Sequence, residues 1–104
     1  MLYDGAIGSL RQSAVAMRAG DRERARARMR KAEAIIDELN GSLDMSVGEL
    51  PDRLRAIYNF CKRHLIHANV ETDPAAIDTV AGLLAELRVG WDQAARVGEP
   101  VDAA

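Results

Sequence analysis

Apolar residues recur at steps of three and four through four segments of this sequence, and this spacing constrains the fold more than any other feature. At about 100° per residue, such steps place side chains on one stripe of an α-helix, which must then be buried against another element. No segment shows the sustained alternation of apolar and polar residues, flanked by turns, that is typical of β-hairpins. The spacing therefore predicts an all-α chain.

Three groups of helix-breaking residues separate the segments, namely Ala19-Gly20-Asp21, the stretch 40–51 and the stretch 70–74. Gly20 can close a helix in the left-handed conformation, and an aspartate can cap the helix that follows. The predicted helices span residues 1–19, 21–43, 50–69 and 74–95. Because most connections are short, we predict an antiparallel up-down four-helix bundle over 1–95, followed by a flexible C-terminal tail over 96–104.

The apolar stripes predict the core of this bundle. The first two helices contribute Tyr3, Ala6, Ile7, Leu10, Ala14 and Met17, then Ala25, Met29, Ala32, Ile36, Leu39 and Leu43. The third contributes Leu50, Leu54, Ile57, Cys61, Leu65 and Ala68, with Tyr58 and Phe60 at the edges of its stripe. The fourth contributes Ile77, Val80, Leu84, Leu87 and Trp91.

Composition limits the class of protein. The chain has 104 residues, a formal net charge of −2 and one cysteine, which indicates one domain without an internal disulfide. The charge disfavours a surface built throughout for nucleic acid or anionic lipid. Since no apolar run is long enough to cross a bilayer and the amino terminus lacks secretion-signal features, we expect a cytoplasmic protein without membrane insertion.

A cysteine and two histidines on one predicted helix have the chemistry of zinc ligands. Cys61, His64 and His67 lie three residues apart on the third predicted helix, and thiolate and imidazole can bind zinc. His67 is displaced from Cys61 by about 120° around the helix, so the three side chains do not converge. We interpret Cys61 as a buried structural residue and both histidines as surface residues. No phosphate, dinucleotide or zinc-protease motif occurs, so we predict no metal, no cofactor and no enzymatic activity.

Basic residues dominate the start of the second helix, from Arg22 to Lys31. On a helix they form two ridges, one of Arg22, Arg26 and Arg30 and another of Arg24, Arg28 and Lys31, on either side of the apolar stripe. Three interpretations remain open: a solvated flank, a site for an acidic protein partner, and a contact with nucleic acid. The lack of interleaved aromatic residues disfavours nucleic acid.

Several large apolar residues lie off the core stripes, and they suggest a binding surface. They include Ile35, Ile66, Val70, Leu83 and Val89. Where such residues are contiguous, they form a groove that can receive an amphipathic helix from another chain.

The order of several short motifs resembles the FliS family of flagellar export chaperones between Leu2 and Trp91. These motifs are Leu2-Tyr3-Asp4-Gly5-Ala6-Ile7, Lys31-Ala32, Ile35-Ile36-Asp37-Glu38-Leu39, Ser42-Leu43-Asp44, Leu54, Ile57-Tyr58-Asn59-Phe60, Ala68-Asn69 with Asp73, and Leu83-Leu84-Ala85-Glu86-Leu87-Arg88 with Trp91.

The resemblance implies a non-enzymatic chaperone that binds the disordered C-terminal segment of flagellin in the cytoplasm and delivers it to the export machinery. Apolar residues left over from the core are then the expected contacts, namely Ile35, Leu39, Leu43, Tyr58, Ile66, Val70 and Leu83. The alternative is a helical adaptor or nucleic-acid-binding module that uses the arginine-rich segment.

Family members usually carry a leader before the Leu-Tyr-Asp-Gly motif, which here follows directly after Met1. We expect apolar surface beside Leu2 and Tyr3 to be exposed in consequence, and we predict a homodimer in the absence of flagellin.

Overall fold

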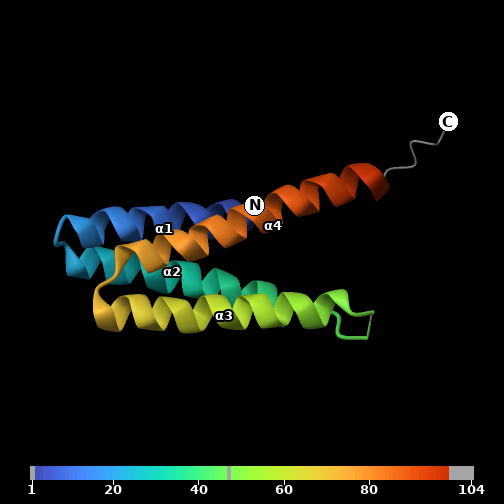
Figure 1. Ribbon diagram of the computed structural model, residues 1–104, viewed down its shortest axis with the longest axis horizontal. Coiled ribbons are helices and arrows are strands. Elements are labelled where there is room, and N and C mark those ends of the chain that lie inside the picture. Colours follow the sequence, from blue (N-terminus) through green and yellow to red (C-terminus); the bar gives the residue numbers. More distant parts are fainter. Residues whose placement is uncertain (1, 47, 99–104) are drawn as a thin grey trace.

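The computed structural model describes residues 2–46 and 48–98, with side chains as far as residue 90. It contains four helices, α1 (Leu2–Arg18), α2 (Arg22–Gly41), α3 (Leu50–Glu71) and α4 (Pro74–Gly98), which Figure 1 shows lying along a common direction. No strand occurs within the described ranges. The predicted all-α class is confirmed.

The turns between helices use the residues that the sequence predicts. Gly20 has φ of 81° and follows α1, and an Asp21 carboxylate oxygen accepts a hydrogen bond of 3.1 Å from the Arg24 amide. Before α4, Asp73 accepts hydrogen bonds from the amides of Ala75 and Ala76. These carboxylates satisfy amide groups that a helix start otherwise leaves without partners.

Three helix ends differ from the predicted ones by two residues or more, whereas the end of α1 and the start of α2 each differ by one. α2 ends at Gly41 instead of residue 43, where the Ser42 amide donates back to the carbonyls of Glu38 and Leu39. α3 continues past residue 69 to Glu71, because Thr72 takes the left-handed conformation with φ of 52° and closes the helix there. α4 continues from the predicted end at 95 to Gly98, and the rest of the predicted tail, residues 99–104, lies outside the described residues.

The helices form a ring in chain order. α1 packs between α2 and α4, and α3 completes the ring by packing against α2 and α4. Short connections reverse the chain between successive helices, which gives the antiparallel up-down bundle predicted from the sequence. The C-terminal part of α4 extends past the start of α1 (Figure 1).

Small side chains allow α1 to approach its neighbours closely. Within the interface with α2, the buried Ser13 hydroxyl donates a hydrogen bond of 2.7 Å to the Ala25 carbonyl. Near the start of α1, a Cβ atom on Gly5 would lie 3.3 Å from Cδ1 of Ile35. The apolar spacing correctly predicts Ala6, Leu10 and Ala14 as core residues of this helix, but it does not predict the buried Ser9, Ser13 and Ala16.

The buried stripe of α3 contains Leu54, Cys61, Leu65 and Ala68 as predicted, but it differs from the predicted stripe at its edges. Tyr58, expected at its edge, is only 2% exposed, whereas Leu50, expected in the core, is 54% exposed, and Ile57 is only partly buried. Pro51, Leu54, Tyr58, Cys61, Leu65 and Ala68 form the buried stripe, again at steps of three and four. Ile57 and Tyr58 are adjacent and both largely apolar, so helical spacing alone did not show which of them faces the core. In α4, the predicted core residues Ile77, Val80 and Leu84 are buried, and the side chain of Trp91 lies outside the described part of the chain.

Ion pairs join α1 to α4 at both ends of their interface. Arg18 pairs with Asp78 at 2.7 Å, and Arg88 pairs with Asp4. Across the α2–α3 interface, Lys62 pairs with Asp37 at 2.5 Å, and this contact raises the pKa of Lys62. All of these side chains are partly exposed, so each pair contributes little to stability and serves mainly to align the helices.

Candidate functional site

A groove opens where the start of α1, the end of α2 and the start of α3 meet. It has a volume of about 380 Å³ and a mostly apolar lining. The lining residues are Tyr3, Leu39, Ser42, Leu43, Asp44, Leu50, Pro51, Leu54 and Tyr58. We call this site the end groove.

The end groove results from the longest connection in the chain. Residues 42–49 join α2 to α3, whereas the other two connections have three residues or fewer. The long connection lets the last turn of α2 and the first turn of α3 lie apart, so their apolar stripes are not fully covered by each other. Leu39 and Leu43 are therefore only partly buried, although they continue the core stripe of α2.

Two tyrosines close the floor of the end groove. The hydroxyl oxygens of Tyr3 and Tyr58 lie 2.5 Å apart, in a hydrogen bond between α1 and α3. Burial raises the pKa of Tyr58, and the hydrogen bond with Tyr3 raises it further. Because Tyr58 stays neutral and its polar atom has a partner, the floor presents ring carbon atoms to anything bound above it.

The rim of the end groove carries one carboxylate. Asp44 accepts hydrogen bonds from the Ser46 amide at 3.0 Å and the Ser46 hydroxyl at 2.5 Å, and these bonds lower its pKa. Leu50 and Met45 are exposed at the same end of the molecule. The site thus combines an apolar floor with an ionised acidic group at its mouth, an arrangement suited to an amphipathic segment.

The structure places the seven predicted binding residues in four locations. Leu39, Leu43 and Tyr58 come together in the end groove. Ile35 lies half-buried beside Gly5 at the α1–α2 interface. The remaining three lie elsewhere: Ile66 (59% exposed) and Val70 (74% exposed) on the outside of α3, and Leu83 half-buried against the core.

Four residues that line the end groove are absent from the predicted binding residues, namely Tyr3, Leu50, Pro51 and Leu54. Leu50 and Leu54 were expected to be covered by neighbouring helices. The signal that could have identified them is the length of the connection before Leu50, since a long connection gives a helix end room to separate from its neighbour.

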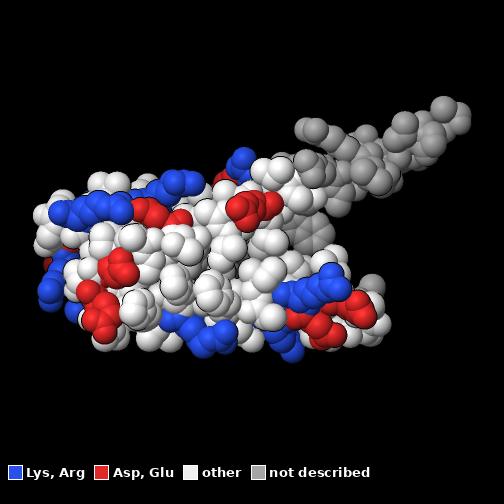
Figure 2. All heavy atoms as spheres, in the orientation of Figure 1, with Lys and Arg blue, Asp and Glu red and all other residues white. Residues whose placement is uncertain are grey.

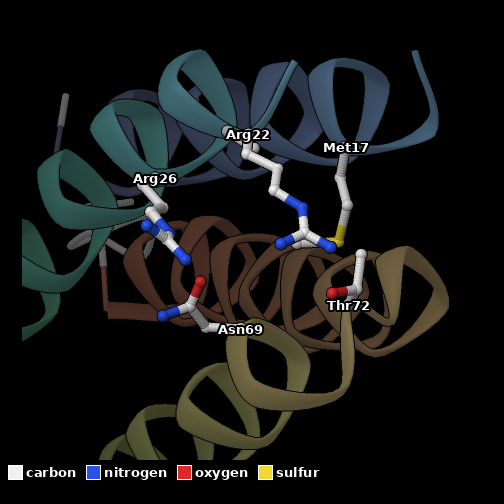
Figure 3. Close-up of a pocket in the computed structure, with 6 residues that line it drawn as sticks. Met17, Arg22, Arg26, Asn69 and Thr72 are labelled. Carbon is white, nitrogen blue, oxygen red and sulfur yellow. The ribbon is translucent and has the colours of Figure 1, made fainter. Parts of the chain in front are cut away.

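A much smaller notch lies at the opposite end of α2. Figure 3 shows Arg22 and Arg26 directed from α2 toward Asn69 and Thr72 at the end of α3, with Met17 beside them. Its volume of about 20 Å³ admits nothing larger than a water-sized group. The last turn of α3 contains no basic residue, so these arginines supply positive charge at the negative end of its dipole.

Cys61 and the two histidines do not form a metal site. Cys61 is fully buried, and burial raises the pKa of its thiol to about 11. His64 and His67 stack along the outside of α3, with His64 also stacked on Phe60. Among the residues with described side chains, no three potential ligands lie close enough to hold an ion.

None of the described helices is both long enough and apolar enough to cross a membrane.

Comparison with known proteins identifies the family. A family model described as "Flagellar protein FliS" matches residues 1–98. The flagellar secretion chaperone FliS of Bacillus subtilis (strain 168) is 35% identical over 94 residues, which cover 90% of this chain and 70% of that protein. The proteins of the same name from Salmonella typhimurium and Vibrio cholerae are 35% and 34% identical, over 89% of this chain and 70% and 69% of their own lengths. The chain therefore belongs to the FliS family, whose curated members are named as flagellar secretion chaperones and not as enzymes.

Proposed function

We propose that this flagellar secretion chaperone binds the disordered C-terminal segment of flagellin in the cytoplasm, with the end groove as its principal contact. The observation that supports the proposal is the cluster of partly exposed apolar side chains from three helices around one apolar floor. An amphipathic segment of flagellin would fold as a helix on this floor and bury its apolar face there. Family membership favours this function over a nucleic-acid-binding module built on the arginine-rich segment.

The apolar contacts set the expected strength of the complex. Each large aliphatic side chain of the client that is buried in the end groove would contribute about 1.5–3 kcal/mol. Ordering of the disordered client opposes binding, by about 2–5 kcal/mol for a segment that folds on its partner. The balance suits a chaperone that must hold its client securely and then release it to the export machinery.

The outside of α3 offers a second contact for the same client. Ile66 and Val70 lie one turn apart and are both well exposed. A disordered segment that leaves the end groove along α3 can cover them, because an extended chain spans up to about 3.3–3.6 Å per residue. Ile35 and Leu83 are half-buried, and we expect them to contribute mainly by supporting the surfaces that bind the client.

The decisive experiment measures the affinity of flagellin's C-terminal segment for two matched variants. Leu43→Asp places a charge on the wall of the end groove, and we expect binding to weaken at least about tenfold, because a carboxylate loses hydration when the client covers it. Val15→Asp makes the same change on the outer surface of α1, where Val15 is 66% exposed, and we expect no change in affinity. Isothermal titration calorimetry with the full chain provides both values.

Helical circular dichroism and the thermal midpoint should match the unmodified protein in both variants, since neither residue is fully buried. Leu39→Asp provides an independent test of the same wall of the end groove. Unchanged flagellin affinity in both Leu39→Asp and Leu43→Asp would exclude the end groove as the client site.

We further propose that two copies associate through the end groove when no client is present. Leu50 and Met45 are exposed at this end of the bundle, and Leu2 is exposed next to Tyr3 of the groove floor. Apolar surface of this kind tends to be covered by a second copy, and flagellin would displace that copy.

A further inference from the structure

A second groove lies along the outside of α1, at the opposite end of that helix from the end groove. It has a volume of about 410 Å³ and a lining that is more apolar than polar in area. The lining residues are Arg11, Gln12, Val15, Ala16, Ala19, Asp21 and Arg24. It shares none of its lining residues with the end groove, and we call it the flank groove.

The floor of the flank groove has the low relief that helix packing requires. Val15 and Ala19 lie one turn apart on the outer face of α1, and both are exposed. Farther along the same helix, Gly8 has open space where a Cβ atom would be. Small residues at these positions allow the axis of another helix to approach within about 8–10 Å of α1.

Basic residues border this floor on both sides. Arg11 lies on the α1 side and Arg24 on the α2 side. Arg28 and Lys31 follow Arg24 along α2 at steps of four and three residues, beyond the lining of the groove, and form a ridge with it. Among the described side chains, no carboxylate lies within ion-pair distance of any of these four cations. The one acidic residue of the groove, Asp21, already accepts the hydrogen bond that caps α2.

This region therefore has an excess of positive charge, with four cations and one lining carboxylate, although the chain as a whole carries a net charge of −2. Figure 2 shows basic side chains, with acidic ones among them, along the margin of the molecule where Figure 1 places α1 and the α1–α2 turn. Mutual repulsion within such a ridge costs stability, and acidic groups of a partner would relieve it.

We propose that the flank groove binds an acidic amphipathic α-helix of a partner protein other than the client. The apolar face of that helix would lie on Val15 and Ala19, and its glutamates and aspartates would face Arg11 on one side and the Arg24–Lys31 ridge on the other. The concave shape of the groove favours a helix over a flat bilayer surface. None of the lining residues is aromatic, which disfavours stacking with nucleic-acid bases.

The test uses the full chain and two synthetic peptides of about eighteen residues, which is five helical turns. The first peptide carries leucines on one helical face and glutamates on both sides of it. The second has the same composition in a shuffled order without such a face. Fluorescence anisotropy should show that the first peptide binds at least about tenfold more tightly than the second, and that added salt weakens this binding.

Substitutions in the chain test whether the first peptide binds in the flank groove or elsewhere on α2. Val15→Asp, and Arg24→Glu combined with Arg28→Glu, should each weaken binding of the first peptide at least about tenfold. Arg30→Glu, which removes a cation from the other ridge of α2, should change it less than about twofold. Circular dichroism checks that each variant retains its helical content.

Several results would overturn the proposal. If the two peptides bind equally, or if Val15→Asp binds the first peptide as tightly as the unmodified protein does, the peptides are bound by charge attraction alone and not in the flank groove. Tighter binding of a single-stranded DNA oligonucleotide or of phosphatidylserine vesicles would assign the surface to another class of partner. Loss of flagellin binding in Val15→Asp would make the flank groove part of the client site and would overturn the proposal of a separate partner. Loss of flagellin binding only in Leu43→Asp would support separate sites for flagellin and for that partner.

Discussion

Tyr58 and Cys61 show how burial changes the chemistry of single residues. Both lie in the buried stripe of α3, and burial raises the pKa of each side chain. A tyrosine placed this way supplies the apolar floor of a groove, and a cysteine placed this way behaves as a small apolar residue. Neither side chain ionises near neutral pH, so α3 provides a neutral wall for both the core and the end groove.

We predict that Cys61 of the native protein resists alkylation. Its thiol is fully buried, and with a pKa of about 11 only about 0.1% is thiolate at pH 8. Iodoacetamide at pH 8 should leave the native protein unlabelled over a period in which guanidinium-unfolded protein reacts completely, as followed by mass spectrometry. Labelling at equal rates in both states would contradict the burial of this residue.

A second prediction at this scale compares two core positions of different burial. Leu84 is fully buried, so Leu84→Ala should lower the free energy of unfolding by about 2–5 kcal/mol. Ile57 is only partly buried, so Ile57→Ala should cost less, about 1–2 kcal/mol, because fewer contacts are lost. Urea denaturation measures both values. An equal or larger loss of stability for Ile57→Ala would mean that Ile57 is buried in the core, as the helical spacing predicts.

The elements differ in how they pack. α1 carries glycine, serine and alanine on much of its surface and approaches α2 and α4 closely, with ion pairs to α4 at both ends. α3 instead carries large side chains and joins the bundle through a long connection. The end groove opens where the start of α3 meets the end of α2 and the start of α1.

Glycines of α1 and of the turn after it give a prediction at the scale of elements. Gly8 lies within a helix with open space around its missing Cβ atom, so Gly8→Ala should stabilise the protein by about 0.5–1 kcal/mol. Gly20 has φ of 81°, so Gly20→Ala should destabilise it by about 1–2 kcal/mol. For a domain of this size, 1 kcal/mol corresponds to about 4–8 °C in the thermal midpoint, so the two variants should shift in opposite directions. Shifts of the same sign would contradict the assigned helix end.

On the scale of the whole molecule, the two grooves lie at different ends of α1 and have different chemistry. The end groove has an apolar floor with an acidic rim, and the flank groove has an apolar floor with basic borders. The two grooves share no lining residues, so substitutions can be made in one without changing the lining of the other.

The proposed self-association makes a prediction at this scale. Light scattering without flagellin should show a molar mass that rises from monomer to dimer between micromolar and millimolar concentrations, and flagellin should convert the dimer into one-to-one complexes. Leu50→Asp should shift the equilibrium toward monomer, since Leu50 is 54% exposed beside the end groove. A monomer throughout this concentration range, with or without flagellin, would refute the dimer.

The sequence by itself determined the elements of this protein, because helix periodicity and capping depend on residues close together in the chain. Gly20, Asp21 and Asp73 took their predicted roles, and Leu10, Ile36 and Leu84 are buried as their spacing required. The order of short motifs also indicated the FliS family, which the comparisons confirm.

Tertiary structure alone decided which residues at the edges of the α3 stripe face the core and where the remaining apolar residues lie. Tyr58 turns inward and bonds to Tyr3, 55 positions away in the chain, while Leu50 turns outward. The end groove depends on how far the end of α2 and the start of α3 separate. The charge of the flank groove depends on which cations have a carboxylate nearby. These properties arise between segments distant in sequence, so no local spacing of residues could specify them.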